Sequence, residues 1–230
     1  MSLYVIGDLH LCKGNSEKSM SIFSGWDDYQ ERIESNWLKI VKPEDTVVLA
    51  GDISWGMSLQ EAEKDFRFID RLPGTKIILK GNHDYWWTTM NKMENFLSSK
   101  GFFTIKILHN NHYRYGTYGI CGTRGWVNMP GETQDDKVLR REVQRLETSI
   151  KSALSEELIP LVFMHYPPIF ASNFNYDILE ILYRYNIREC YYGHIHGRSA
   201  HELCVTNTYD GINFHLISGD YLQFIPEKVL

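Results

Sequence analysis

The sequence predicts an α/β fold in which two sheets pack together and helices lie outside. Short apolar runs typical of buried strands alternate with segments of helical spacing through roughly the first two hundred residues. A further series of short strands late in the chain adds a second patch of sheet. The 230 residues, 43% hydrophobic and 23% charged, can form one sizeable core, so we expect a single domain over residues 1–230.

The elements of the first half follow from their apolar patterns and caps. Asp28–Val41 has helical spacing and stops before Pro43. A capping box at Ser58-Leu59-Gln60-Glu61 predicts a helix that opens there and is ended by Pro73-Gly74. Thr88–Ser99 is predicted as a helix closed by Gly101. Three short apolar runs are predicted as buried strands: Leu3–Ile6, Thr46–Ala50 and Lys76–Lys80.

The second half has one long helix and several short strands. Asp135–Leu154 is the clearest helix, because its apolar residues form one stripe. Tyr176–Tyr185 is predicted as a second helix, and the tail from Leu203 alternates short strands and turns. The predicted strands are Phe102–Leu108, Tyr113–Tyr115, Tyr118–Cys121, Leu161–Met164 and Glu189–Tyr192.

Composition excludes several classes of protein. The formal net charge of -5 argues against a surface that binds nucleic acid broadly. No run approaches the roughly 20 apolar residues that span a bilayer, and no signal peptide is recognisable. The four cysteines are spread widely without a Cys-x-x-Cys pair, which favours free thiols. We therefore expect a cytoplasmic protein with no membrane partner.

Potential metal ligands follow five of the predicted strands. Because sites in open α/β sheets form beyond the carboxyl ends of strands, these side chains are expected to meet in one crevice. Glycine precedes the polar group at Gly51, Gly81 and Gly193, where it lets the backbone turn sharply and approach an ion. In strand order the side chains are Asp8 and His10; Asp52; Asn82, His83 and Asp84; His165; and His194 and His196.

Each of these motifs has an ordinary structural interpretation when taken alone. His165 would be a core histidine, and Gly81-Asn82-His83-Asp84 could be a tight turn with an Asx cap. The combination argues against that interpretation, because five of the nine histidines stand at these strand ends together with Asp8 and Asp52. The other histidines are interpreted as structural or surface residues: His109, His112, His201 and His215.

The ordered motifs resemble those of the calcineurin-like metallophosphoesterase superfamily between residues 8 and 196. The resemblance implies a four-layer α/β/β/α sandwich with two packed mixed sheets and a two-metal site. It implies that Asp52 bridges the two metals and that His83 is catalytic but not a ligand. By the same resemblance one metal would be held by Asp8, His10, Asp52 and His196, and the other by Asp52, Asn82, His165 and His194.

The chemistry of these residues agrees with phosphoester hydrolysis. Two cations roughly 3.5–4 Å apart can clamp the attacking and leaving oxygens and activate a water. His83 could protonate the leaving alkoxide or contact the developing charge. Nitrogen and oxygen donors without thiolate favour Mn, Fe or Zn, with Co and Ni also compatible. We expect two divalent ions and hydrolysis of phosphomonoesters or phosphodiesters of a small molecule.

One departure from the superfamily narrows the activity. Phosphoprotein phosphatases follow Gly-Asp with a second aspartate and an arginine, whereas this chain has Gly51-Asp52-Ile53-Ser54-Trp55-Gly56. In those relatives the aspartate usually orients the catalytic histidine and the arginine binds phosphate, and both are absent here. Protein Ser/Thr phosphatase and dinucleoside-tetraphosphatase activities are therefore disfavoured, and the partner of His83 is left open. The lipid-A-pathway diphosphatases carry arginine where His83 stands and are disfavoured too.

Two alternative functions and two substrate contacts stay open. A metal-dependent nuclease is opposed by the charge, and a non-catalytic scaffold of the same fold by the filled motif positions. Arg124 could bind phosphate or form a surface salt bridge. Trp86 could stack on a base or sugar or fill the core. The substrate, the native metal and the oligomeric state are not indicated by the sequence.

Overall fold

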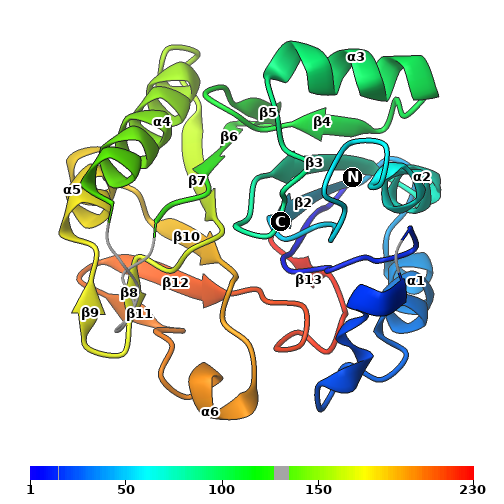
Figure 1. Ribbon diagram of the computed structural model, residues 1–230. Coiled ribbons are helices and arrows are strands. Elements are labelled where there is room, and N and C mark those ends of the chain that lie inside the picture. The colour runs from blue at the N-terminus through cyan, green and yellow to red at the C-terminus, as the bar shows by residue number, and fades with distance from the viewer. Residues whose placement is uncertain (15, 127–134) are drawn as a thin grey trace.

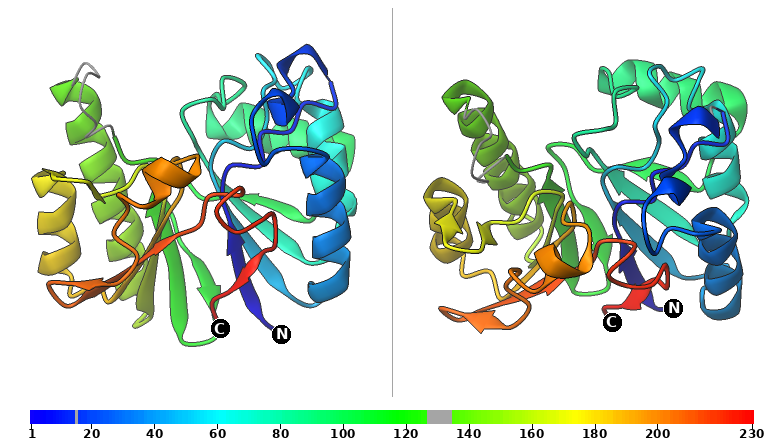
Figure 2. Two further views of the ribbon diagram at one scale, coloured as in Figure 1. Left: turned by 90° about the horizontal axis from the view of Figure 1, so that it is seen from below. Right: turned by 60° about the horizontal axis from the view of Figure 1, so that its bottom comes forward.

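Two large sheets lie next to each other with helices on their outer sides, as the two views of Figure 2 show. The computed structural model describes residues 1–14, 16–126 and 135–230. Helices α1, α2 and α3 cover one sheet, and α4 and α5 cover the other (Figure 1). This confirms the predicted fold class, in which two large mixed sheets are flanked by helices.

The first sheet has the strand order β13-β1-β2-β3-β4. Strands β1 to β4 are parallel and β13 is an antiparallel edge strand. Its strands are β1 Leu3–Ile6, β2 Thr46–Ala50, β3 Thr75–Leu79, β4 Ile105–Ile107 and β13 Glu227–Lys228. Its helices are α1 Tyr29–Ile40, α2 Glu63–Arg71 and α3 Met90–Lys100, preceded by 3₁₀ turns at Ser16–Lys18 and Met20–Ile22.

The second sheet has the order β11-β12-β10-β7-β6-β5. Its inner strands β12, β10, β7 and β6 are parallel, and β11 and β5 are antiparallel edges. Its strands are β5 Tyr113–Tyr115, β6 Tyr118–Thr123, β7 Ile159–Met164, β10 Glu189–Tyr192, β11 Thr208–Tyr209 and β12 Ile212–Leu216. The remaining elements are α4 Asp136–Leu154, the hairpin β8 Ile169–Phe170 with β9 Asn173–Phe174, α5 Tyr176–Arg184 and α6 Arg198–His201.

Alternation along the strands divides the core into layers. In β2, Val48 and Ala50 join the apolar layer between the sheets, whereas Val47 and Leu49 pack toward the helices. Phe163 of β7 belongs to the same layer between the sheets. Because parallel strands are covered on both faces, they appear in the sequence as continuous apolar runs.

Most predicted bounds differ from the structure by at most two residues, and two differ by more for local reasons. The helix predicted from Ser58 begins at Glu63, because Ser58 accepts hydrogen bonds from the backbone of Glu61 and Ala62 and closes only a turn. The strand predicted over Phe102–Leu108 is shortened to β4, because Phe102 bonds back to the end of α3. Within the described residues, no helix is both long and apolar enough to cross a membrane.

Candidate metal centre

Both sheets direct the carboxyl ends of their parallel strands to one edge. A parallel bridge between Gly7, after β1, and Ser218, after β12, joins the sheets there, and Gly7 donates to the carbonyl of Ile217 at 2.7 Å. Among the described residues, two groups of metal-ligand side chains gather at this edge. The predicted residues from five strand ends are thus brought together, as the parallel arrangement requires.

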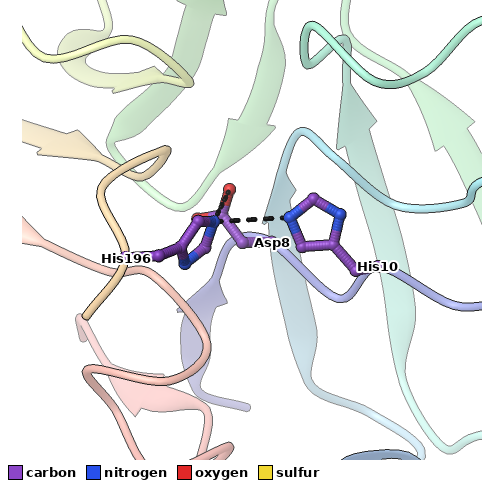
Figure 3. Close-up of side chains that lie close together, drawn as sticks. All are labelled: Asp8, His10 and His196. Atoms are coloured by element: carbon purple, nitrogen blue, oxygen red, sulfur yellow. Dashed lines mark hydrogen bonds and ion pairs between the residues drawn. The ribbon is translucent and has the colours of Figure 1, made fainter. Parts of the chain in front are cut away.

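We call the first group, Asp8, His10 and His196, site A. Figure 3 shows the three side chains pointing toward one another, with dashed lines that join His196 to both Asp8 and His10. The Nε2 atoms of His10 and His196 are 3.3 Å apart, and His196 Nε2 lies 3.6 Å from Asp8 Oδ1. Asp8 and His10 are buried and come from the loop after β1, whereas His196 follows β10 of the other sheet.

We call the second group, Asp52, His165 and His194 with Asn82, site B. His165 Nε2 lies 2.6 Å from Asn82 Oδ1, 3.2 Å from His194 Nδ1 and 3.5 Å from Asp52 Oδ2. His165 and Asp52 are buried and the other two are partly exposed. Site B thus combines two side chains from each sheet.

Asp52 lies between the two sites. Its Oδ2 is 3.5 Å from His165 Nε2 in site B and 3.7 Å from His10 Nε2 in site A. Its Oδ1 accepts a hydrogen bond of 2.7 Å from the backbone N–H of His83, which fixes the carboxylate. One oxygen of Asp52 therefore faces donors of both sites.

The donor set fits cations. His165 Nδ1 lies 3.1 Å from the carbonyl oxygen of Ala50, which only an N–H can satisfy, so its Nε2 carries a lone pair. Burial lowers the pKa of His165 well below its ordinary value, so the ring stays neutral. The Nε2 lone pair then faces the oxygen of Asn82, and two acceptors at this separation repel unless a cation lies between them.

The burial of two carboxylates also favours bound cations. Burial raises the pKa of Asp8 to about 8, with Asp52 adding repulsion, and burial raises the pKa of Asp52 to about 6. Removing two neighbouring carboxylates from water is unfavourable unless positive charge compensates them. His10, His165 and His194 do not supply it, because burial keeps their pKa values well below the ordinary one. His196 supplies part of it, because Asp8 and Asp220 raise its pKa against the effect of burial.

The loops after β2 and β3 touch at their glycines. A Cβ on Gly81 would lie 2.0 Å from Asp52 Oδ1, so no other residue fits without displacing that carboxylate. Gly51 has φ +87°, and a Cβ there would approach His165 Nδ1 to 2.8 Å. The glycines thus let the loops pack directly against Asp52 and His165, and their predicted close approach to an ion stays a prediction.

Asp84 holds the two loops together and takes no part in either site. Its buried carboxylate accepts backbone hydrogen bonds from Gly81 at 2.7 Å, Ile53 at 2.9 Å and Ser54 at 3.2 Å. Burial, and then repulsion from Asp52, raise the pKa of Asp84 to about 7. Asp84 is thus a structural clamp under the candidate metal centre.

Asp220 was missed by sequence analysis. It lies four residues beyond β12, and its Oδ1 is 2.8 Å from His196 Nδ1 while Oδ2 accepts from Gly197 N–H at 2.9 Å. This contact leaves His196 Nε2 for site A. The rule that found Asp8, a polar residue just beyond an apolar strand, would also have found Asp220 had Ile212–Leu216 been identified as a parallel strand.

His83 stands beside both sites without joining either group. Its Nδ1 is 3.3 Å from the hydroxyl of Tyr85, and the ring of Trp55 lies 4.5 Å from its ring. Burial lowers the pKa of His83, although Asp52 opposes this. Tyr85 is therefore the neighbour of His83 in a chain that lacks the usual aspartate.

The two predicted substrate contacts lie elsewhere. Trp86 is 3% exposed, donates its Nε1–H to Asp84 at 3.0 Å and packs edge-on against Phe66. This placement contradicts substrate stacking by Trp86, because core packing and the bond to Asp84 occupy the ring. Arg124 lies 3.5 Å from Glu142 and over the ring of Trp126, outside both candidate sites.

Comparisons with solved structures agree with the fold. The fold resembles a protein of unknown function, AQ665, from Aquifex aeolicus (19% identity, TM-score 0.58, covering 99% of this chain and 95% of that one). It also resembles the phosphopantetheinyl hydrolase PptH from Mycobacterium tuberculosis (14% identity, TM-score 0.54, covering 100% and 95%). TT1561 of Thermus thermophilus is similar over 85% of this chain and 82% of that one, at 10% identity and TM-score 0.54.

The sequence itself decides the family. No curated protein matches the chain significantly. The sequence model of the calcineurin-like phosphoesterases, however, matches residues 1–198. Since that match spans most of the chain, the protein belongs to the calcineurin-like phosphoesterase family and is a phosphoester hydrolase that depends on divalent metals.

Proposed function

We propose that the protein is a dinuclear metal-dependent phosphohydrolase that cleaves phosphomonoesters or phosphodiesters of a small molecule. The observation that carries this proposal is the position of Asp52, whose Oδ2 faces His10 of site A and His165 of site B at 3.7 and 3.5 Å. A single carboxylate so placed can serve two cations at once and reduce their mutual repulsion.

Each site has a complete set of donors. Site A offers Asp8, His10 and His196, and site B offers His165, His194 and Asn82, with Asp52 shared. Nitrogen and oxygen donors without sulfur favour Mn, Fe or Zn. Bound cations would supply Lewis acidity toward the phosphate oxygens and lower the pKa of a nearby water.

His83 is the residue that we assign to proton transfer. We assign the Tyr85 hydroxyl, 3.3 Å away, as the donor to Nδ1. The proton of His83 then stands on Nε2, from which it can pass to the oxygen of the leaving alcohol. Trp55 packs against the rings of both His83 and His10, at 4.5 and 5.0 Å, and limits their rotation. Tyr85 thus takes the orienting place of the missing aspartate.

A groove beside site A supports a small-molecule substrate. Its volume is about 760 Å³, and its lining includes Asp220, Gly197, Arg198 and Tyr221. Asp220 and Gly197 are bonded to each other next to the ligand His196. Volumes of roughly 300–1,000 Å³ are typical of sites for small molecules, so the leaving group has room here.

Metal loading and chelation test the proposal. Protein loaded with Mn²⁺ should hold two equivalents of metal by elemental analysis and should hydrolyse p-nitrophenyl phosphate or its bis-ester. EDTA should abolish the hydrolysis, and Mn²⁺ should restore it. Activity that survives chelation, or a full activity with one metal per chain, would contradict the dinuclear assignment.

A further inference from the structure

A second group of charged side chains surrounds a small cavity between the two sheets and α4. The cavity, of about 10 Å³, lies at the ends of β3 and β6. Among its lining residues are four basic side chains and one acid: Lys80, His109, Arg124, Arg145 and Glu142. We call these five residues the basic cavity. None of them belongs to site A or site B.

The one acid of the basic cavity is already fully engaged. Glu142 is 1% exposed and accepts from Thr123 Oγ1 at 2.6 Å through one oxygen. Its other oxygen accepts from Arg145 and lies 3.5 Å from Arg124. One carboxylate therefore faces two guanidinium groups, and Lys80 adds a third positive charge.

Lys80 has no acceptor of its own. Within the described residues its ammonium group makes no hydrogen bond and no ion pair, although the residue is half-buried. Burial and Arg145 lower the pKa of His109. Like charges in a partly desolvated place repel one another, and an anion would relieve that repulsion.

The basic cavity adjoins the candidate metal centre. Lys80 stands two positions before Asn82 of site B, so their Cα atoms are at most about 7.6 Å apart. The carbonyl of Arg124 accepts from the N–H of Tyr166, next to His165, at 2.8 Å. The basic cavity and site B are therefore built on neighbouring residues of the same two loops.

There is room for an anion at the mouth of the cavity. The cavity itself holds about one water molecule. A groove of about 300 Å³ shares Asn110 and Arg145 with it and is also lined by Arg141. A phosphate group in this groove could be reached by the flexible side chains of Arg145 and Lys80.

We propose that the basic cavity binds a second phosphate group of the substrate, so that the preferred substrates carry two phosphates and one of them is hydrolysed at the metal centre. This inference rests on the proposed function for the hydrolysed phosphate. The second phosphate is held by charge-assisted hydrogen bonds from Lys80, Arg145 and Arg124 and undergoes no reaction.

The test uses flexible probes of graded length on the Mn²⁺-loaded protein. The bisphosphates of ethanediol, butanediol and hexanediol are compared with their monophosphates, by calorimetric binding and by the release of phosphate. At least one bisphosphate should bind about 10-fold more tightly than its monophosphate. Lys80→Gln should remove that advantage, and so should Arg145→Gln, which leaves Arg124 and Thr123 on Glu142. Arg71→Gln, a surface arginine paired with Glu34, is the matched control and should keep the advantage.

The outcomes separate this inference from the proposed function. If no bisphosphate exceeds its monophosphate, or if Lys80→Gln leaves the ratio of affinities unchanged, the basic cavity is not a phosphate site, even when hydrolysis proceeds. If the ratio of bisphosphate to monophosphate affinity depends on Lys80 but no probe is hydrolysed, the basic cavity is a phosphate site and the proposed hydrolysis fails for these esters. If Lys80→Gln weakens the binding of single-stranded DNA more than it weakens the binding of the bisphosphates, the basic cavity is a nucleic-acid site and the inference is overturned.

Discussion

Sites A and B use similar donors but orient them by different means. In site B, His165 is fully buried and its Nδ1 bonds to a backbone carbonyl, that of Ala50 in β2. In site A, His196 is partly exposed and its Nδ1 faces the carboxylate of Asp220. Site B is therefore oriented by the sheet itself, whereas site A depends on a replaceable side chain.

The difference has a chemical consequence. A carboxylate behind a ligating histidine raises the basicity of the ligand, whereas a carbonyl fixes the tautomer without adding charge. We therefore expect the affinity of site A, more than that of site B, to be tuned by substitution. Four variants test this comparison, ordered from the largest expected effect to the smallest.

Asp52→Asn should disable both sites together. The amide removes the charge that faces His10 and His165, so bound metal should fall below one equivalent and turnover by about 10⁴-fold or more. Elemental analysis and steady-state kinetics measure the two effects. Asp177→Asn, at the exposed start of α5, is the matched control. If the Asp52→Asn variant still binds two equivalents of metal, Asp52 is not a ligand shared by the two sites.

His83→Ala should lower turnover and leave both sites filled. His83 is in neither group, so the loss should lie between about 10² and 10⁴-fold in kcat at unchanged metal content. The sharpest measurement uses two esters that differ only in the basicity of the leaving alcohol, because proton transfer matters less for a good leaving group. Loss of metal instead would show that His83 acts as a ligand.

Asp220→Asn should separate the two sites. Loss of the carboxylate behind His196 should weaken one metal by about 10 to 100-fold and leave the other unchanged. Calorimetric titration of the metal-free protein with Mn²⁺ measures both affinities. The two affinities should differ more in the variant than in the parent protein. Equal weakening of both metals would indicate that Asp220 supports the whole loop and not site A alone.

Tyr85→Phe should have the smallest effect. Removing the hydroxyl 3.3 Å from His83 Nδ1 frees the ring without touching a ligand, so kcat should fall by about 10-fold with KM and metal content retained. In the His83→Ala protein, Tyr85→Phe should cause no further loss of kcat, because Tyr85 acts on the reaction only through His83. If the losses of kcat add in the double variant, Tyr85 contacts the substrate directly and does not act through His83.

The sequence was informative about the strands and the side chains at their ends. Leu3–Ile6, Thr46–Ala50 and Glu189–Tyr192 form strands with the predicted bounds. Parallel strands covered on both faces must be continuously apolar, and their carboxyl ends share an edge, so Asp8, Asp52 and the histidines could be expected to meet. Their assignment to particular metals stays a prediction.

Tertiary structure alone decided the contacts between segments that are distant in sequence. The sequence left Trp86 open between core and substrate, and packing against Phe66 and Asp84 placed it in the core. Asp220 meets His196, and Lys80 meets Arg124, only because strands from both sheets end side by side. A strand's apolar pattern depends on its own burial and is local, whereas the partner of a polar side chain depends on where the rest of the chain brings another polar group.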